Sequence, residues 1–352
     1  MAYTTIKKPS DYFNTKTYSG NSSTQAITGV NFQPDFTWLK RRDQTSFHYL
    51  FDSIRGVQKR LSSNSDTTEA TVSTSLTSFD SDGFTLGSEG DVNESGGTYV
   101  GWNWKANGTG VSNTDGSITS TVSANTTSGF SIVSYTGNGS STGSNVVGHG
   151  LGTTPSMIMI KARAGTNAVN NWYCWHKGLS ANNNIQLNTT NAQFTTSFAS
   201  AGIINTSPTS TTFGFDSGTS VLNINESGTT YIAYCFAEVK GFSKFGSYVG
   251  NGSTDGTFVY TGFKPAFVMG KATSGNENWF MNDNKRLGYN DKNYRLYPNL
   301  SNNEATDINM DIFSNGFKLN SINGNSNGSG ITYIYMAFAE EPLVGDNPAT
   351  AR

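Results

Sequence analysis

A motif that occurs three times along the chain constrains its fold more than any other feature. The turn Asn-x-Ser-Gly precedes a stretch rich in aromatic and β-branched residues at 93–104, at 225–238 and at 327–340. A polar turn followed by such a stretch is typical of a β-strand. Self-similarity of this kind indicates that one structural unit has been repeated. We therefore expect three copies of one strand-rich unit.

Two further motifs recur in the same order. Each copy opens with Tyr-x-Gly-Asn, and a proline, a strand-like stretch and a lysine six residues after the proline follow it. Proline is tolerated at the start of a strand, where its missing N–H is not needed. We expect the lysine to end the strand with its charge in water. The proline-to-lysine segments are 34–40, 155–161 and 265–271.

The composition favours an all-β protein. The chain of 352 residues holds 39 Gly but only 8 Pro, together with 16 Tyr and 22 Phe, and no long stretch has a helical apolar period. Many short strands joined by tight turns give this composition. The sequence predicts three tandem antiparallel β-sandwiches, at 1–110 with a short N-terminal anchor segment, 111–241, and 242–352 with a short C-terminal tail. Residues 107–116 are expected to form a flexible linker.

Charge and hydropathy exclude several kinds of partner. The 23 basic and 25 acidic residues give a net charge of −2, so we expect no nucleic-acid partner. No apolar run approaches the roughly 18–20 residues of a membrane span, so we expect no membrane insertion. The first nine residues lack the apolar segment of a secretory signal. We therefore expect synthesis in a host cytoplasm.

The cysteines align with apolar positions of the other copies. Cys174 matches Leu50 and Met281, and Cys235 matches Ala337. Both are thus expected to be core residues and not nucleophiles. A Cys174–Cys235 disulfide is a less favoured alternative, because neither other copy has one.

Catalytic and metal sites lack support in the sequence. There are three histidines and no Cys/His cluster, which argues against a zinc site or a Ser-His-Asp arrangement. The acidic residues at 80–91 fit turn chemistry better than a calcium loop. A depolymerase using Asp82 and Glu89 is the enzymatic alternative. We expect no enzyme, no catalytic residue, no metal and no cofactor.

An aromatic residue beside Asn-rich loops is the best candidate for ligand binding. Strand alternation places Trp175 on the face opposite Cys174, and sugar rings stack on exposed aromatic rings. The alternative is that Trp175 covers a neighbouring domain. His176, His149 and Asp283 complete the candidate ligand-binding set, since they lie in a Gly-rich loop or at polar strand ends.

Two short basic segments are candidates for docking to other proteins. Lys7 and Lys8 lie in the N-terminal segment, and Arg41 and Arg42 follow the first repeated strand. Basic side chains can bind an acidic partner surface, whereas the simpler alternative is that they are solvated strand ends.

The recurring motifs resemble those of a known group of proteins. Tyr-x-Gly-Asn-Gly-Ser, Pro-Asp-Phe-Thr-Trp-Leu-Lys and Thr-Tyr-Ile-Ala-Tyr-Cys-Phe-Ala are similar to repeated domains in structural proteins of marine tailed bacteriophages. The resemblance covers about Lys8 to Pro342. It implies jelly-roll, concanavalin-like sandwiches of the LamG or SPRY kind, and it brings no catalytic residues.

The resemblance also implies a role in the virion. The expected function is a surface-exposed fibre or receptor-binding protein that contacts other virion proteins and binds host surface polysaccharide in a lectin-like manner. The alternative is a capsid-decorating or tail-assembly protein with contacts to proteins alone. A homotrimer and a monomer with internal pseudo-threefold symmetry are both open.

Overall fold

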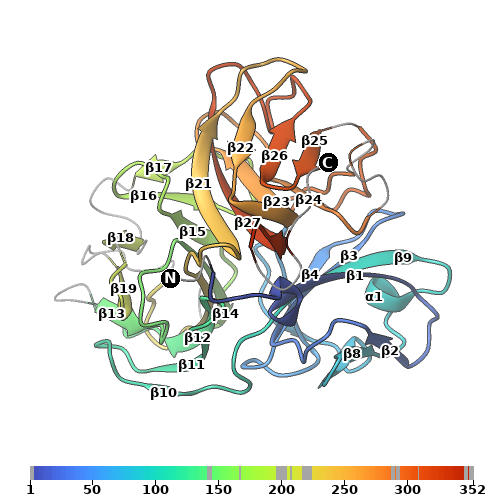
Figure 1. The fold of residues 1–352 in the computed structure, drawn as a ribbon. Helices are drawn as coiled ribbons and strands as arrows, with labels where there is room; N and C mark the ends of the chain where they lie inside the picture. The colour runs from blue at the N-terminus through green and yellow to red at the C-terminus, as the bar shows by residue number, and fades with distance from the viewer. Residues whose placement is uncertain are drawn as a thin grey trace.

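The structure is a computed structural model, and nearly all of its regular elements are β-strands (Figure 1). The prediction of an all-β fold is therefore confirmed. The described residues are 4–140, 145–165, 168–195, 204–206, 208–215, 224–286, 290, 294–307, 309–344 and 348.

Copy one consists of a large sheet and a small one. A 3-10 helix, η1 (Pro9–Asp11), precedes them, and a single helical turn, α1 (Gly90–Asn93), lies before the last strand. The large sheet has the order β1 (Phe13–Ser19), β9 (Thr98–Trp104), β3 (Phe36–Arg41), β4 (His48–Asp52), β5 (Lys59–Ser62), β6 (Ala70–Thr71). The small sheet has the order β2 (Gln25–Thr28), β8 (Gly83–Leu86), β7 (Leu76–Asp80).

Copy two repeats this order and adds two strands at one edge. Its large sheet has the order β10 (Val111–Asn113), β11 (Ser120–Asn125), β12 (Phe130–Thr136), β20 (Thr230–Phe236), β14 (Met157–Ala164), β15 (Tyr173–His176), β16 (Asn183–Gln186), β17 (Phe194–Thr195). Its small sheet has the order β13 (Asn145–Gly148), β19 (Thr212–Phe215), β18 (Ile204–Thr206).

Copy three has the same central strands. Its large sheet has the order β21 (Ser243–Val249), β27 (Thr332–Pro342), β23 (Phe263–Ala272), β24 (Phe280–Asp283). Its small sheet has the order β22 (Phe258–Tyr260), β26 (Gly316–Leu319), β25 (Met310–Phe313). All named strand pairs in the three copies are antiparallel, as expected for sandwiches with hairpin connections.

The two faces of each large sheet serve different cores. One face packs against the small sheet of its own copy, and this gives three separate apolar clusters. The other face meets the large sheets of the other two copies in one shared cluster, which includes Trp104, Tyr234 and Phe338. In Figure 1 the copies form three lobes around this centre. Because the central core is shared, the division into three independent domains remains a prediction.

Two tyrosines from different motifs stack in every copy. One belongs to the Tyr-x-Gly-Asn opening and the other is the second residue of the last long strand. Their ring centroids lie 5.0–5.1 Å apart, with interplanar angles of 10–14°. The hydroxyl of the opening tyrosine donates to the carbonyl before the turn asparagine. Packing between the motifs therefore explains why both recur. The pairs are Tyr18–Tyr99, Tyr135–Tyr231 and Tyr248–Tyr333.

The turn asparagine fixes the opening loop. In copy one the N–H of Asn21 donates to Oδ1 of Asn93 at 2.9 Å, and the same bond recurs in the other copies. The glycine before the loop asparagine is required by close backbone approach. A Cβ at Gly20 would lie 2.2 Å from the carbonyl oxygen of Glu94. The recurring Gly-Asn pair is thus an architectural feature.

Equivalent contacts close the three copies into a ring. In each contact a backbone N–H of one copy donates to a backbone carbonyl of its neighbour, at 2.8–3.0 Å. Copy one contacts copy two, copy two contacts copy three, and copy three contacts copy one. A head-to-tail contact that closes in this way generates cyclic symmetry. The three donor–acceptor pairs are Glu69–Arg163, Gln193–Thr273 and Glu304–Arg42.

The three recurring lysines are buried, so the expectation that their charges reach water is wrong. Lys40, Lys161 and Lys271 are at most 1% exposed, and each Nζ donates to the carbonyl of the following residue. Nζ of Lys161 also donates to Asp66 O of copy one at 3.0 Å. Burial lowers the pKa of Lys40 to about 7 and of the other two to about 8. The neighbouring copy covers each strand end, which a pattern within one copy cannot reveal.

The segment 107–116 is not a free linker. Its residues Val111–Asn113 form β10, which pairs with β11 of copy two. The N–H of Asn107 donates to Ser123 Oγ at 2.8 Å, and that of Gly108 to Asp35 Oδ1 at 2.9 Å. Its polar, Gly-rich composition therefore reflects tight turns between paired strands.

Both cysteines are free and buried, as their alignment predicts. Cys174 belongs to the shared core, whereas Cys235 belongs to the core of copy two. Since the two side chains pack in different clusters, the disulfide alternative fails.

Candidate functional site

The strand β15 brings Trp175 to the rim of a small cavity. The strand alternates as expected, with Cys174 facing the shared core and Trp175 packing partly on the core of copy two. The cavity has a volume of about 120 Å³. Trp175 is half-buried, so its indole covers its own copy and is in part accessible. The cavity is lined by Trp175, His176, Lys177, Leu179, Ser180, Ala181 and Asn182.

The exposure of Trp175 is particular to copy two. The aligned residues of the other copies, Phe51 and Asn282, are fully buried. The turn after the strand also differs, because copies one and three carry the buried arginines Arg55 and Arg286 there. Copy two has the half-buried Leu179 at this place. The repeat does not require an accessible aromatic ring here.

The loop beyond β15 supplies polar groups near the indole. The N–H of Ser180 donates to Gln193 Oε1 at 3.0 Å, and Gln193 Nε2 donates to Ser180 Oγ at 3.1 Å. Lys177 forms an ion pair with Glu238 at 2.6 Å. Asn182 is exposed, with a φ of 59° in the left-handed region that asparagine tolerates. An aromatic ring beside hydroxyl, amide and ammonium groups can stack on a sugar and bond its hydroxyls.

His176 lies next to Trp175 but points inward. Its Nε2 donates to the carbonyl of Tyr335 in copy three at 3.1 Å, and its Nδ1 accepts from the N–H of Gly178. The ring is 1% exposed, and burial lowers its pKa to about 3. His176 is thus a neutral contact between copies that also lines the cavity beside Trp175, with both ring nitrogens already hydrogen-bonded.

Asp283 and His149 are also away from the surface. Asp283 is 1% exposed, pairs with Arg286 at 2.6 Å and accepts from Trp102 Nε1 of copy one at 2.9 Å. His149 is fully buried, and its Nδ1 accepts from the N–H of Leu151. The structure does not bring these residues to the cavity beside Trp175. Polar residues at strand ends such as Asp283 and His176 make contacts between copies. From the sequence of one copy, such a residue looks the same as one that binds a ligand at the surface.

The loop residues Lys177, Ser180 and Asn182 were not predicted as site residues. The Asn-rich run that ends this loop was the available signal, since copies one and three have arginine-containing turns there. No group of three or more His, Cys, Asp or Glu side chains suited to a metal occurs in the described ranges. In the same part of the chain, no helix is long and apolar enough to cross a membrane.

A family comparison places the whole ring in one group. A family model described as a domain of unknown function, DUF7483, matches residues 8–342. The chain belongs to the DUF7483 family. No curated protein and no solved structure matches the chain. Because the match spans all three copies, DUF7483 corresponds to the complete ring and not to a single sandwich.

Two of the predicted docking residues of this DUF7483 chain are engaged internally. Arg42 Nη2 lies 2.9 Å from Glu304 Oε2, so this arginine joins copy one to copy three. Arg41 is 7% exposed and pairs with Asp43 and Glu94. Both guanidinium groups are thus paired within this chain, Arg41 with the nearby Asp43 and with Glu94, and Arg42 with Glu304 of copy three.

The N-terminal lysines of the DUF7483 chain remain on the surface. Lys7 and Lys8 are exposed, whereas the preceding residue, Ile6, is buried in the shared core. Lys8 pairs with Asp11 at 2.8 Å. Both lysines line a cavity of about 370 Å³ together with Lys285 and Glu340 of copy three. The anchor segment is thus held by this chain, and its charges face outward.

Proposed function

We propose that this DUF7483 chain is a bacteriophage virion structural protein of the surface-exposed fibre or receptor-binding type, which binds a host cell-surface glycan. The accessible indole of Trp175 beside a small polar cavity is the observation that carries the glycan proposal. The recurring motifs and their resemblance to phage structural proteins support the virion location.

The arrangement of charge and burial agrees with a binding role. Both cysteines, His149 and His176 are buried in packing roles. Asp82 is exposed and accepts the N–H groups of Gly29 and Asn31 in a turn, and Glu89 is half-buried beside Arg60. Burial raises the pKa of both thiols far above the usual range, which disfavours the reactive thiolate. A fixed β-scaffold that presents loops is a common support for recognition.

The glycan proposal is tested on an array of host surface polysaccharides. The intact protein is expected to bind at least one of them, and Trp175→Ala is expected to weaken that binding at least tenfold. Phe47→Ala removes another exposed aromatic ring, 45% exposed in copy one, and serves as the matched control. Equal binding by Trp175→Ala and the unchanged protein, or no binding to any polysaccharide of a susceptible host, would refute the glycan role.

The second candidate is a capsid-decorating or tail-assembly protein with contacts to proteins alone. The observation that favours it is the exposed pair Lys7 and Lys8 beside the 370 Å³ cavity. Ile6 fixes this segment in the core, so the lysines are presented in a defined place. Imaging of the intact particle, with this chain located at the head or the tail, distinguishes the two candidates.

A further inference from the structure

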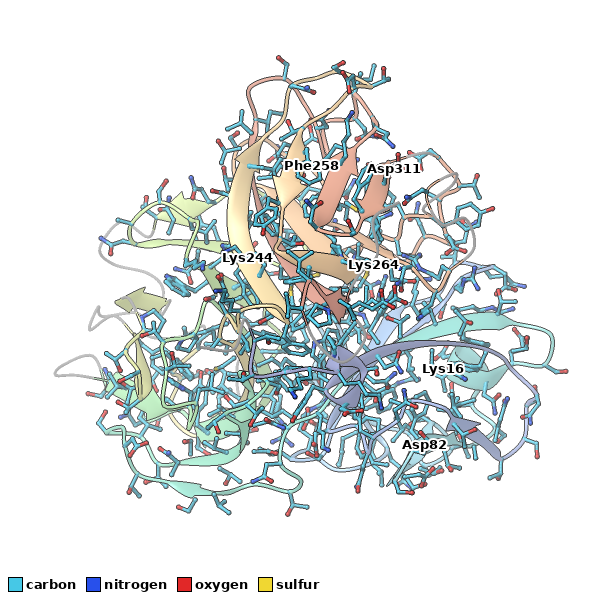
Figure 2. The ribbon with its side chains drawn as sticks, viewed as in Figure 1. Lys16, Asp82, Lys244, Phe258, Lys264 and Asp311 are labelled. Carbon is cyan, nitrogen blue, oxygen red and sulfur yellow. The ribbon has the colours of Figure 1, made fainter. Side chains whose placement is uncertain are left out.

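The small sheet of copy three carries an unusual edge strand. In β22 the side chains of Phe258 and Tyr260 are 45% and 57% exposed, while Val259 between them is buried. Phe258 also contacts Phe313 of β25 edge-to-face, with ring centroids 6.1 Å apart. Figure 2 shows Phe258 and Asp311 on this part of copy three, at the top of the view. Two exposed aromatic rings on a three-residue edge strand are a typical recognition feature.

The backbone of this edge has unused hydrogen-bonding groups. Val259 is opposite Phe317 on β26, and its two flanking residues have their N–H and C=O groups on the outer side. The N–H of Leu319 donates to Thr257 O, and the N–H of Thr261 donates to Asn315 O, so residues 257 and 261 direct their backbone groups toward β26. Because this direction alternates along an antiparallel strand, residues 258 and 260 direct theirs away from β26. Within the described part of the chain, the outer backbone groups of Phe258 and Tyr260 have no partner. An edge of this kind accepts an added strand.

Copy two shows what covers the equivalent edge. There β13 takes the place of β22, and residues 117–118 lie beside it with a parallel bridge between Ile118 and Val147. The N–H of Ile118 donates to Val146 O at 3.0 Å, and the N–H of Val146 donates to Ser117 Oγ at 3.1 Å. Ile118 is 5% exposed within the core of copy two. An extended Ser-Ile segment therefore fits this kind of edge.

The length of the connection decides which copy is covered. Residues 105–119 join β9 to β11 and are long enough to reach β13, whereas residues 237–242 join β20 to β21 directly. Copy three thus has no preceding segment to spare for β22. Copy one leaves β2 uncovered too, but its outward residues Ala26 and Thr28 are small. Among the described first strands of the three small sheets, only β22 combines an open edge with exposed aromatic side chains.

We propose that the outer edge of β22 binds an extended segment of a different protein by strand addition. The segment lies parallel to β22, as residues 117–118 lie to β13, with a branched aliphatic residue next to Val259 and a small hydroxyl residue beside it. A second copy of this chain cannot supply its Ser117–Ile118 segment, because that segment is already used on its own β13. This mode of recognition uses main-chain bonds for affinity and side-chain contacts for specificity.

The aromatic rings give the site its selectivity. A strand added beside β22 places alternate side chains on the outer face, next to Phe258 and Tyr260. Lys318 lies opposite Phe258 on β26 and is paired with the exposed Asp255. Asp311 of β25 lies on the other side of Lys318, so the ammonium group has two carboxylates as neighbours and the face offers no unpaired cation to an acidic segment.

A labelled synthetic peptide with the sequence of residues 116–120, Gly-Ser-Ile-Thr-Ser, and with both ends capped so that it carries no charge, serves as the probe for the full-length protein. We expect saturable binding and slower hydrogen exchange at the amides of Phe258 and Tyr260. Phe258→Pro removes an outward N–H and is expected to weaken binding at least tenfold. Ala26→Pro, the matched change on the uncovered β2 edge, is expected to leave binding unchanged.

Several results would overturn the proposal. The first is that the peptide does not bind, and the second is that Phe258→Pro and Ala26→Pro bind it equally. The third is that the unchanged protein self-associates in sedimentation and that Phe258→Pro abolishes this association. Thermal unfolding first establishes that each variant is folded. If Phe258→Pro is not, Phe258→Lys replaces it, since a charge at an edge opposes strand addition. This variant must also lose at least tenfold in binding, and full retention would contradict the inference.

Discussion

The hydroxyl of Tyr234 in copy two donates a hydrogen bond to Oδ2 of Asp52 in copy one at 2.8 Å. Asp52 is fully buried and also forms an ion pair with Arg55, which is equally inaccessible. In copy three, Asp283 makes the same pair with Arg286 and accepts from Trp102 of copy one. Two of the three contacts between copies thus contain a buried charged pair that receives a hydrogen bond from the neighbour.

Removal of one partner of this pair is expected to be costly. Asp52→Ala leaves the guanidinium of Arg55 buried without its main counter-ion, and we expect a loss of about 3–5 kcal/mol in the free energy of unfolding. Urea unfolding followed by tryptophan fluorescence measures it. Lys8→Ala, which breaks an exposed pair with Asp11, should leave the unfolding midpoint nearly unchanged. Similar midpoints for the two variants would contradict this account of the ring.

The loop glycine of each copy is expected to tolerate no side chain. Gly20→Ala forces a Cβ to within 2.2 Å of the Glu94 carbonyl oxygen, so the backbone must move. We expect a loss of roughly 1–3 kcal/mol, as in other overpacked sites. Gly90→Ala is the control, because the nearest atom to its Cβ is 3.9 Å away. Urea unfolding measures the stability of the two variants. If Gly20→Ala is as stable as the unchanged protein, the argument from close backbone approach is wrong.

The buried lysines should make stability rise with pH. For Lys161 the folded pKa of about 8 lies below the ordinary 10.5, so between these values the unfolded chain binds more protons than the folded one. The unfolding free energy then increases with pH, by roughly 1.4 kcal/mol per pH unit for this lysine.

The measurement compares the unchanged protein with Lys161→Met in urea at pH 8 and pH 10. The unfolding free energy of the unchanged protein minus that of Lys161→Met should be larger at pH 10 than at pH 8. A difference that does not depend on pH would show that this ammonium group keeps its ordinary pKa. Lys16→Met, at a half-buried lysine outside the core, controls for general effects of charge.

His176 should weaken the contact between copies two and three in acid. Its folded pKa of about 3 is below the ordinary 6.5, so its contribution is fully present above about pH 6.5 and is lost as the pH falls toward 3. His176→Gln keeps an N–H donor for Tyr335 O without titrating. The stability advantage of the unchanged protein over this variant should decrease between pH 7 and pH 4, as measured by urea unfolding. An advantage that stays constant over this range would contradict the prediction.

The sequence predicted the strands well because their determinants are local. The Asn-x-Ser-Gly turn, the opening tyrosine and the strand after the proline recur, and in the structure they meet within each copy. The same comparison placed Cys174 and Cys235 in cores. It also predicted the opposite facing of Trp175 and Cys174, since strand alternation needs no knowledge of distant segments.

The predicted site was less successful for a physical reason. Polar residues at the strand ends, such as Asp283 and His176, and the basic Arg42 have partners in other copies. Their chemistry suits a surface ligand as well as a buried contact, and sequence alone does not distinguish the two. Burial of the lysines was missed on the same ground.

The sequence by itself determined that one strand-rich unit is repeated three times, each with its opening motif, its proline-to-lysine strand and its Asn-x-Ser-Gly turn. Only the tertiary structure decided that the inner sheet faces meet in one core and that the copies close into a ring. The reason is that an apolar strand face gives no sign of whether it packs on its own small sheet or on another copy. The exposure of β22 was likewise decided by which segments the connections could bring to cover it.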